Sequence, residues 1–426
     1  MTVPKLRFKE FDGGWTKSTI QFFMDNNFIL DQMDGNHGEL YPKSEEFSAT
    51  GVPYISATDF SFGDVNFATC KRLPIERAKL FKKGIAKNGD VLFAHNATVG
   101  PVAILKTDLD FVILSTTATY YRCEATYLNN HYLKNYFESD FFVQQYFGIM
   151  SQSTRNQVPI TTQRKLNIAV PNIQEQTKIA SFLSAVDEKI SQLTQKHELL
   201  SQYKQGMMQK LFSQQLRFKA DDGSEFGEWE NKTLSNFIIK HIGGASLKPS
   251  DFVEQSEYEV IPKKAIVPNG YLNLDKDNPT YCSEDFFKAN LKNTVDNTYL
   301  VTVLRDLVPS GPSIGYIVKY MENTQYILAQ GVYGFKLKEE LNKDFLIHFS
   351  NTKAYRLVMQ SIMVGSTQVH IRNQDFFGIE IPVPCLEEQT KIANFLSAID
   401  QKIEVVAQQI EQAKTWKTGL LQQMFV

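Results

Sequence analysis

The sequence predicts an α+β protein made of two globular domains and two long helices, and three observations lead to this prediction. First, residues 171–212 and 384–425 repeat one another without a gap, and thirteen of sixteen positions are identical between Glu175–Ile190 and Glu388–Ile403. Second, an apolar heptad pattern typical of paired helices runs through both copies. Third, each copy follows a block of short apolar runs and turn residues typical of strands and loops. Duplication is therefore the organising feature of the chain.

Length and composition describe an ordinary soluble protein. The chain has 426 residues, 42% of them hydrophobic and 22% charged, and a formal net charge of −2. This length allows two or three domains, and the balanced charge gives no argument for a polyanionic partner. A polar N-terminus and no apolar run near eighteen residues predict neither a signal peptide nor a membrane span. Four scattered cysteines without a CxxC pair are typical of reduced thiols, so we expect a soluble, cytoplasmic protein.

A short opening segment stands before each block. Leu6–Lys9 leads to Trp15, and Leu216–Lys219 leads to Trp229. The last residues, Gln422–Phe425, match the end of the first repeated segment, so the chain stops where a further opening segment would begin. We therefore expect a pseudo-twofold, circularly closed arrangement with adjacent termini.

The first block, residues 21–170, contains short apolar and β-branched runs separated by turn residues, a pattern typical of strands. The predicted strands are Val52–Ile55, Asp90–Ala94, Val102–Leu105 and Phe111–Leu114. Leu128–Phe147 then carries aromatic and aliphatic residues at three-to-four spacing, which predicts a pair of helices. Their aromatic side chains are expected in the core rather than facing a ligand.

The second block, residues 230–383, repeats this plan loosely. Tyr299–Leu304 and Ser313–Val318 are predicted strands, and Phe345–Met363 is a predicted helix. The apolar side of that helix is predicted to contain Phe345, Phe349, Leu357 and Ile362. Outside a few landmarks the blocks share little sequence, which favours one duplicated α+β scaffold with divergent surfaces.

The repeated segments predict two long helices. A proline opens each copy (Pro171, Pro384), and apolar residues then alternate at spacings of four and three for about five heptads. Either helix alone would expose a long apolar stripe, so the two are expected to pack as an antiparallel coiled coil. At 1.5 Å per residue, about 39 residues make a rod roughly 58 Å long. His197, Lys204 and Lys417 interrupt the seam, which favours register control or fraying ends over a ligand role.

These elements divide the chain into four parts. The first globular domain is predicted over residues 1–172 and the first long helix over 173–213. The second globular domain is predicted over 214–383 and the second long helix over 384–426. The helices would hold the divergent globular domains apart at a fixed distance.

A search for catalytic motifs finds none. The sequence has no GxxxxGK[ST] phosphate loop, no GxSxG, no HExxH, no glycine-rich dinucleotide fingerprint and no [DN]PP[YF] stretch. Its seven histidines are dispersed and give neither base–nucleophile nor zinc-ligand spacing. We therefore expect a non-catalytic chain without a cofactor or metal of its own, although a catalytic pair distant in sequence would escape such a search.

A basic run is the first candidate contact with an anionic partner. Residues 71–87 carry seven basic side chains and one acidic one, a local net charge of +6. A helix predicted over Pro74–Ile85 would place Lys79, Lys82 and Lys83 on one face and its apolar residues toward the core. Clustered Lys and Arg favour phosphate contact, and a solvated face is the alternative. The candidates are Lys71, Arg72, Arg77, Lys79, Lys82, Lys83 and Lys87.

Polar residues at the block ends form a second group of candidates. The segments 152–157 and 366–370 stand at matching positions before the long helices, and Arg, Asn and Gln side chains can pair with base edges. Capping of the turn before each helix is the alternative. A polar loop after the strand at 90–94 and separated basic residues in the second block complete the group. It comprises His95, Asn96, Ser153, Thr154, Arg155, Asn156, Gln157, Lys263, Lys264, Arg305, Ser366, Thr367, Gln368, His370 and Arg372.

Taken together, these features resemble the DNA-specificity subunit of type I restriction–modification enzymes. The resemblance is carried by the paired Glu-Gln-Thr-Lys-Ile-Ala helix openings, the Gly-Asp-Val-Leu-Phe stretch at 89–93, the Leu-Arg-Phe opening segments and the Ser-Thr exits. It covers the whole chain, although Leu300–Asp306 departs from the Gly-Asp-[Ile/Val]-Leu-Phe pattern in the second block.

The resemblance implies a function and partners. Two target-recognition domains would each read one half of a bipartite, asymmetric site in double-stranded DNA. The helices would set the spacer and dock two methyltransferase (modification) subunits, which restriction (translocase) subunits join. S-adenosylmethionine, ATP and Mg²⁺ would belong to those partners. The alternatives are a coiled-coil scaffold whose domains bind protein or another ligand, and an enzyme whose motifs are hidden.

Overall fold

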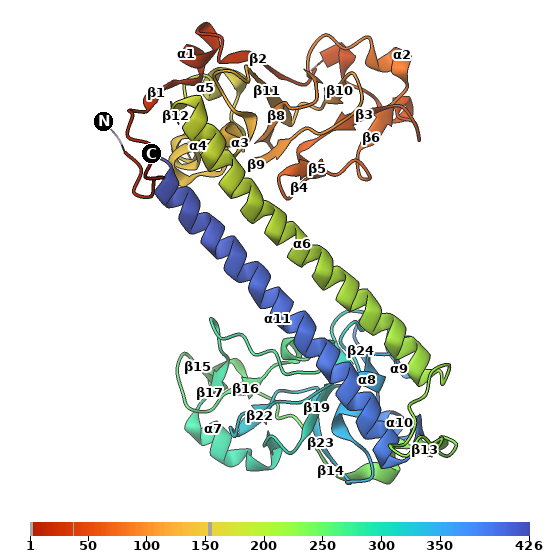
Figure 1. Ribbon diagram of the computed structural model, residues 1–426. Coiled ribbons are helices and arrows are strands. Elements are labelled where there is room, and N and C mark those ends of the chain that lie inside the picture. The colour runs from red at the N-terminus through yellow and green to blue at the C-terminus, as the bar shows by residue number, and fades with distance from the viewer. Residues whose placement is uncertain (1–2, 37, 152–155) are drawn as a thin grey trace. The chain divides into compact units, whose positions relative to one another are not determined.

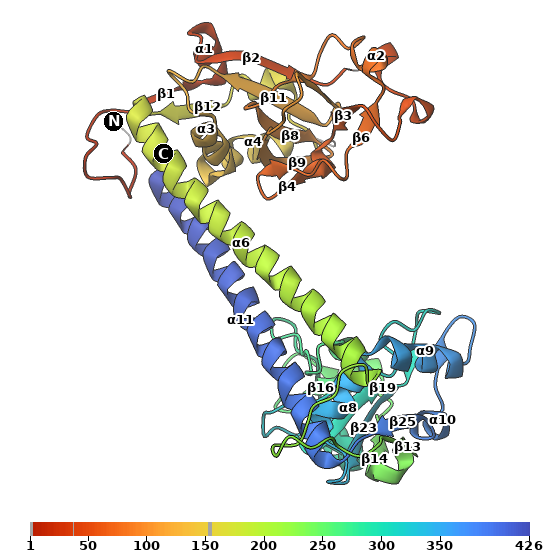
Figure 2. The ribbon, with the colours of Figure 1, turned by 45° about the vertical axis from the view of Figure 1, so that its right-hand side comes forward.

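The structure, a computed structural model, describes residues 3–36, 38–151 and 156–426. Its contacts group the chain into two compact units. Unit 1 consists of the residues up to Lys196 together with Val406–Val426, and unit 2 is His197–Val405. Each unit therefore contains part of both long helices, α6 (Ile173–Phe212) and α11 (Leu386–Met424) (Figures 1 and 2). The α+β class is confirmed, whereas the four-part division of the chain stays a prediction.

Unit 1 combines an antiparallel sheet and a mixed sheet with helices (Figure 1). Its larger sheet has the order β2-β11-β8-β9, formed by Ile29–Asp34, Ala118–Cys123, Val91–Asn96 and Thr98–Ile104. A second sheet has the order β6-β3-β10-β7, formed by Lys71–Leu73, Val52–Ile55, Val112–Leu114 and Ile85–Ala86. Smaller pairs are β1 (Thr16–Thr19) with β12 (Asn167–Val170) and β4 (Phe60–Ser61) with β5 (Asp64–Val65). The helices are α1 (Ile20–Asp25), α2 (Ile75–Ala78), α3 (Asn130–Glu138), α4 (Asp140–Met150) and α5 (Ile160–Gln163).

The predicted helical pair of unit 1 is confirmed as α3 and α4, and much of its aromatic content lies in the core. The Asn129 side chain caps α3 by accepting a hydrogen bond from the backbone N–H of Tyr132. Phe137 stacks on Phe142 with ring centroids 4.3 Å apart, and both rings meet the edge or face of Phe93 in β8. These contacts fix the helices on one face of the larger sheet.

The helix predicted over residues 74–85 is wrong. α2 is a single turn, and irregular chain follows it. Gly84 would in any case end a right-handed helix before Ile85, because its φ is +67° and an added Cβ would lie 2.8 Å from the Cα of Gly35. A right-handed helix cannot continue through a left-handed residue. Phe81 is buried as expected, but Ile75 and Leu80 are exposed, so the lysines do not share a helical face.

Unit 2 follows the same plan with shorter strands. One sheet has the order β14-β23-β19-β21, formed by Ile238–Gly243, Val332–Leu337, Leu300–Val303 and Ile317–Val318. Another has the order β16-β22-β18, formed by Val260–Ile261, Tyr326–Leu328 and Thr294–Val295. The pairs are β13 (Glu230–Thr233) with β25 (Glu380–Val383), β15 (Phe252–Val253) with β17 (Tyr281–Cys282), and β20 (Arg305–Asp306) with β24 (Val369–His370). The helices are α7 (Glu284–Ala289), α8 (Lys343–Ser350), α9 (Lys353–Ile362) and α10 (Asn373–Phe377).

Two predictions for this unit need correction. The single helix expected over Phe345–Met363 is two helices, because Thr352 caps a new start after α8 ends. The break changes which side of the second helix is covered, so Leu357, predicted to be apolar core, is exposed. Of the strand expected over Ser313–Val318 only β21 is extended, because Gly315 has a φ of +80°.

The long helices run antiparallel within each unit, as predicted. In unit 1 the start of α6 lies beside the end of α11 (Figure 2), and Lys417 Nζ is 2.7 Å from Asp187 Oδ1. In unit 2 the end of α6 lies beside the start of α11, and Lys204 Nζ is 2.5 Å from Asp400 Oδ1. Two of the residues that interrupt the apolar seam therefore pair across it, which favours register control.

The opening segments close each unit in the same way. The backbone N–H of Leu6 donates to the carbonyl of Gln423 (2.8 Å), and that of Leu216 donates to the carbonyl of Lys210 (3.1 Å). The start of the chain thus joins the end of α11 as the second opening segment joins the end of α6. The circularly closed plan is confirmed.

The repeated glutamate at the start of each long helix explains why the opening segments recur. In unit 1 the guanidinium of Arg7 donates two hydrogen bonds of 2.7 Å to the buried Glu175 carboxylate, and the indole N–H of Trp15 donates a third of 3.3 Å. A buried carboxylate needs such partners to offset its desolvation. Unit 2 repeats the cluster with Arg217, Glu388 and Trp229.

Candidate nucleic-acid interface

In unit 1 the end of β8 meets the segment that leaves the globular part, and we call this contact the strand-end junction. The backbone N–H of His95 donates to the Thr117 carbonyl (3.0 Å), and the His95 carbonyl accepts from the N–H of Val158 (2.8 Å). Asn96 faces Gln157 in an isolated antiparallel bridge. Candidates that are far apart in the sequence are therefore neighbours in the structure.

Exposure separates the candidates at this junction. The His95 side chain is only 5% exposed, so it supports the junction from inside. Asn96 and Gln157 are half-buried and Asn156 is exposed. The Asn156 amide donates a hydrogen bond of 3.3 Å to the carbonyl of Ala97. The candidates Ser153, Thr154 and Arg155 lie outside the described residues.

Unit 2 has a strand-end junction with the same backbone bonds. The N–H of Leu304 donates to the Gly331 carbonyl (3.0 Å), and the Leu304 carbonyl accepts from the N–H of Ile371 (2.9 Å). Arg305 then pairs with His370 where β20 meets β24. The pattern of donors and acceptors is that of unit 1, so both units end their central strand in one way.

The shared bonds reveal a correspondence that the sequence pattern did not show. Leu304 occupies the position of His95, and Arg305 occupies that of Asn96. Leu300–Asp306 lacks the Gly-Asp start of the unit 1 stretch, so only the backbone contacts identify it. The polar segments 152–157 and 366–370, which we call the exit segments, stand at equal distances before the long helices. This equal spacing was the one available sequence signal.

Basic candidates gather at the junction of unit 2. An added Cβ at Gly331 would lie 2.9 Å from Lys263 Cε and 3.0 Å from Arg305 Cβ, so these two side chains converge above that glycine. Lys264 has a different surrounding, with its Nζ 3.4 Å from Asp275 Oδ2.

The exit segment of unit 2 is a tight turn before β24. Gly365 has a φ of +114°, and Val364 and His370 exchange backbone hydrogen bonds of 2.9 and 3.0 Å around it. His370 itself is half-buried. The exposed candidates of this segment are Ser366, Thr367, Gln368 and, at the start of α10, Arg372.

The basic run at 71–87 belongs to the other sheet of unit 1, and part of its charge is neutralised. Arg77 Nε is 2.5 Å from Glu46 Oε1, and Lys79 Nζ is 3.0 Å from Glu76 Oε1. Glu76 already belongs to the run and to its net charge of +6, whereas Glu46 lies outside it. Glu46 therefore makes the local charge smaller than the sequence of the run indicates.

The remaining basic residues of this run face solvent or line a cavity. Lys71 Nζ stands 4.9 Å from the centre of the Phe47 ring, and Arg72 donates to the Gly51 carbonyl (3.2 Å). A cavity of about 420 Å³ lies beside Lys71 and Arg72, with Phe47 and Phe67 in its lining. The exposed members of the run are its five lysines, Lys71, Lys79, Lys82, Lys83 and Lys87.

Other kinds of site were searched in the described chain. Among residues 3–36, 38–151 and 156–426, no group of three or more His, Cys, Asp or Glu side chains is placed to hold a metal ion. The four cysteines are free thiols, and burial raises the pKa of Cys70 to about 12. Within the same residues, no helix has the length and apolarity needed to cross a membrane.

Comparison with known proteins identifies the family of the chain. The family model of the type I restriction modification DNA specificity domain matches residues 31–202 and 227–415, one range in each half of the sequence. The chain belongs to the family of type I restriction–modification DNA specificity domains. Each strand-end junction, including its exit segment, lies within one of the two matched ranges.

Relatives and solved structures agree with this family. The chain is 28% identical over 263 residues to the type I restriction enzyme MjaVIII specificity subunit of Methanocaldococcus jannaschii, a match that covers 60% of either protein. Its fold is similar to that of the type I S subunit from M. genitalium (TM-score 0.57, 15% identity, covering 100% of this chain and 99% of that one). It is also similar to a chain solved in work on complex assembly and conformational transition of the type I R-M system (TM-score 0.58, 18% identity, 98% and 99% covered). At these sequence identities, the two structural similarities show a shared fold and nothing further.

Proposed function

We propose that this chain is the specificity subunit of a type I restriction–modification system and that it binds double-stranded DNA at a defined sequence. The observation that carries the proposal is the pair of strand-end junctions, built on one backbone plan within the two family domains. They present amide side chains in unit 1 and a guanidinium and an imidazole in unit 2. Amides suit adenine edges, and guanidinium groups suit guanine or phosphate.

The two units would read different halves of one bipartite site. This follows from their unlike junction residues, because identical halves would need the same side chains at the same backbone positions. Asn96, Asn156 and Gln157 would contact the first half-site, and Arg305, His370 and the exposed exit of unit 2 the second. The exposed lysines of the 71–87 run would contact phosphates, which position a protein without specifying bases.

The long helices would set the number of base pairs between the half-sites. They have 40 and 39 residues, so each is about 60 Å long at 1.5 Å per residue, and one DNA turn is about 34 Å. Their outer faces would dock two methyltransferase subunits, which restriction subunits join. This chain would be non-catalytic, and S-adenosylmethionine, ATP and Mg²⁺ would bind to those partners.

Methylome sequencing tests the proposal directly. The chain is expressed with its methyltransferase partner in a host that lacks other type I systems. A new methylated motif, split into two unlike halves by an unread spacer, is the expected result. Hosts that carry the partner alone should lack it, and no new split motif in the co-expressing host would refute the function.

A substitution in unit 1 tests the division of labour. Asn96→Ala with Gln157→Ala should relax or change one half of the motif and leave the other half as it was, because each junction serves its own half-site. The matched control is Gln215→Ala, which removes an exposed amide outside both junctions and both long helices and should leave both halves unchanged. A double variant that alters both halves would refute separate reading by the two units.

A further inference from the structure

Two cations of unit 2 converge at its strand-end junction. Lys263 begins a 3-10 turn after β16, and Arg305 begins β20. An added Cβ at Gly331, whose φ is +89°, would meet Lys263 Cε at 2.9 Å, Lys263 Nζ at 3.4 Å and Arg305 Cβ at 3.0 Å. Glycine thus leaves the space between the two side chains open.

The convergence is not neutralised within the described part of the chain, where neither cation forms an ion pair. The nearby carboxylate of Asp306 accepts hydrogen bonds from its own loop, from the N–H groups of Val308 (3.2 Å) and Ser313 (3.4 Å). Burial and the charge of Arg305 lower the pKa of Lys263, and Asp306 opposes this only in part. Two like charges held together in this way gain from an anion between them.

Unit 1 has a corresponding position at its own junction, but no lysine or arginine stands there. The parallel pairing of β3 with β10 and of β16 with β22 aligns Ile55 with Ile261, so Ala57 corresponds to Lys263. Gly331 corresponds to Thr117, which accepts the N–H of Ala57 through its hydroxyl (2.9 Å).

This unit 1 contact is uncharged and satisfied within the chain, so the fold itself does not require cations at the junction. The two charges of unit 2 therefore call for another explanation than folding.

We propose that Lys263 and Arg305 clamp one phosphodiester group of duplex DNA above Gly331. The inference rests on the proposed function. It adds a contact to the DNA backbone at the strand-end junction, which the junction of unit 1 does not make. A phosphate is the anion that fits, because the exposed Ser366–Gln368 turn and His370 adjoin Arg305 and would lie along the same strand. Such a contact fixes the register of the unit on the duplex.

The salt dependence of binding tests the clamp in the full chain. The affinity for a duplex carrying the methylome motif and for an unrelated duplex is measured over a range of KCl concentrations. Loss of one phosphate contact in Lys263→Gln with Arg305→Gln should reduce the slope of log K against log salt by about 0.9. Because the contact carries no sequence information, both duplexes should lose affinity to a similar degree, on the order of tenfold.

Two control variants sharpen this test. Lys288→Gln removes a lysine of α7 whose Nζ lies 2.6 Å from Glu284 Oε1, and should keep the wild-type slope. Lys263→Arg with Arg305→Lys keeps both charges and should retain most of the slope, which separates loss of charge from loss of folding.

The outcomes distinguish the clamp from the function. An unchanged slope in the double glutamine variant, with wild-type sequence preference intact, overturns the clamp and leaves the proposed function standing. Wild-type chain that binds no duplex overturns both. Inorganic phosphate, titrated by ³¹P line broadening, is the second arm: if the pair affects phosphate binding but not the DNA slope, the site serves a free anion and the DNA clamp is refuted.

Discussion

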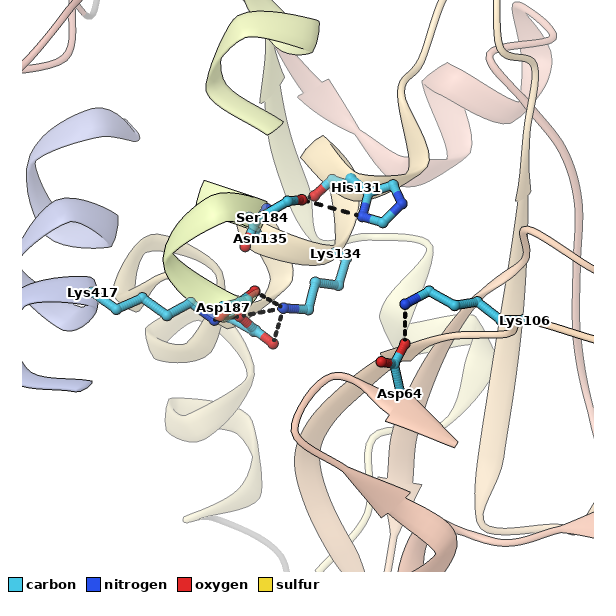
Figure 3. A network of polar contacts seen from close by, with 9 residues as sticks. Asp64, Lys106, His131, Lys134, Asn135, Ser184, Asp187 and Lys417 are labelled. Carbon is cyan, nitrogen blue, oxygen red and sulfur yellow. Dashed lines mark hydrogen bonds and ion pairs between the residues drawn. The ribbon is translucent and has the colours of Figure 1, made fainter. Parts of the chain in front are cut away.

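Lys134 and His348 occupy comparable places in the two units, where a globular helix meets the long helices. Lys134 of α3 is buried, with Nζ 3.0 Å from Glu138 and 2.8 Å from Asp187. Lys417 of α11 contacts the same two carboxylates, both at 2.7 Å (Figure 3). Two cations and two carboxylates thus balance one another, which a buried charge requires.

In unit 2 the globular helix contributes a neutral ring instead. His348 Nε2 lies 3.1 Å from Ser397 Oγ, and Nδ1 lies 3.9 Å from Asp400 Oδ2. Burial, and next the charge of Lys204, lowers the pKa of His348 to about 3. Asp400 already has Lys204 as its partner, so a second cation is not needed there.

The depressed pKa makes His348 a source of acid sensitivity. An unfolded histidine titrates near pH 6.5, so the unfolded state binds the proton first as pH falls. The stability contributed by the neutral ring is therefore complete above about pH 6.5 and is lost progressively toward pH 3. His348→Gln should remove this loss, on the order of 4 kcal/mol over the window.

Hydrogen exchange of the α8 amides against pH measures this effect in unit 2. The free energy of opening in the wild type should fall more steeply below pH 6.5 than in His348→Gln. His197→Gln, at a half-exposed position of α6, is the matched control and should follow the wild type. Parallel curves for wild type and His348→Gln would contradict the prediction.

At the scale of elements, the seam lysines determine how α6 and α11 align. Lys204→Met leaves Asp400 half-buried without its cation and should cost unit 2 about 1–2 kcal/mol. Adding Asp400→Leu should restore the stability, because an apolar pair fits a seam while the ion pair serves register. Urea unfolding of the two single variants and the double variant gives the coupling energy, expected at about 1 kcal/mol or more.

Lys414→Met is the control for this cycle in urea unfolding of the chain alone, since Lys414 pairs with Glu411 on the exposed side of α11. It should change stability by less than about 0.5 kcal/mol. A double variant as unstable as Lys204→Met alone would show that the pair does not act as a unit.

The sequence predicted an element correctly where a single apolar periodicity continued without interruption. The heptad seam, the aromatic helices α3 and α4 and strands such as Val52–Ile55 have this property. Prediction failed where local backbone geometry decides the outcome, as at Gly84, whose left-handed φ lies inside the helix predicted over residues 74–85, and at Thr352, which starts a second helix. Neither residue changes the pattern of apolar positions, so periodicity could not reveal it.

Prediction of the site was limited in a different way. Clustered charge is visible in a sequence, but its internal neutralisation, such as Arg77 by Glu46, depends on residues far along the chain. The equivalence of Arg305 with Asn96 also depends on backbone hydrogen bonds alone. Contacts between distant segments therefore decide which candidates meet, and local patterns do not record them.

At the scale of the whole molecule, closure of the chain rests on two hydrogen bonds within unit 1, one from the opening segment to the end of α11 and one from α3 to the last residue. Leu6 N–H donates to the Gln423 carbonyl (2.8 Å), and the Tyr136 hydroxyl donates to the Val426 carbonyl (2.9 Å). Phe425 is buried against Tyr132 and Tyr136. The end of the chain is thus part of the unit 1 core, as Leu211 is part of the core of unit 2.

A circular permutant tests this symmetry. Val426 is joined to Met1 through a short flexible linker, and the chain is opened between Ser213 and Gln214. By the repeat, this site corresponds to the place between the end of α11 and the first opening segment, and Gln214 is exposed with a φ of +58°. Opening a left-handed, exposed residue should cost little.

The permutant should fold, and its melting temperature should lie within a few degrees of the wild type, because no core contact is removed. With the methyltransferase partner it should methylate the same split motif. Opening the chain inside β19, between Val301 and Thr302, is the control and should abolish folding, since both residues are buried. An insoluble permutant opened at Ser213 would show that the two ends of the ring are not equivalent.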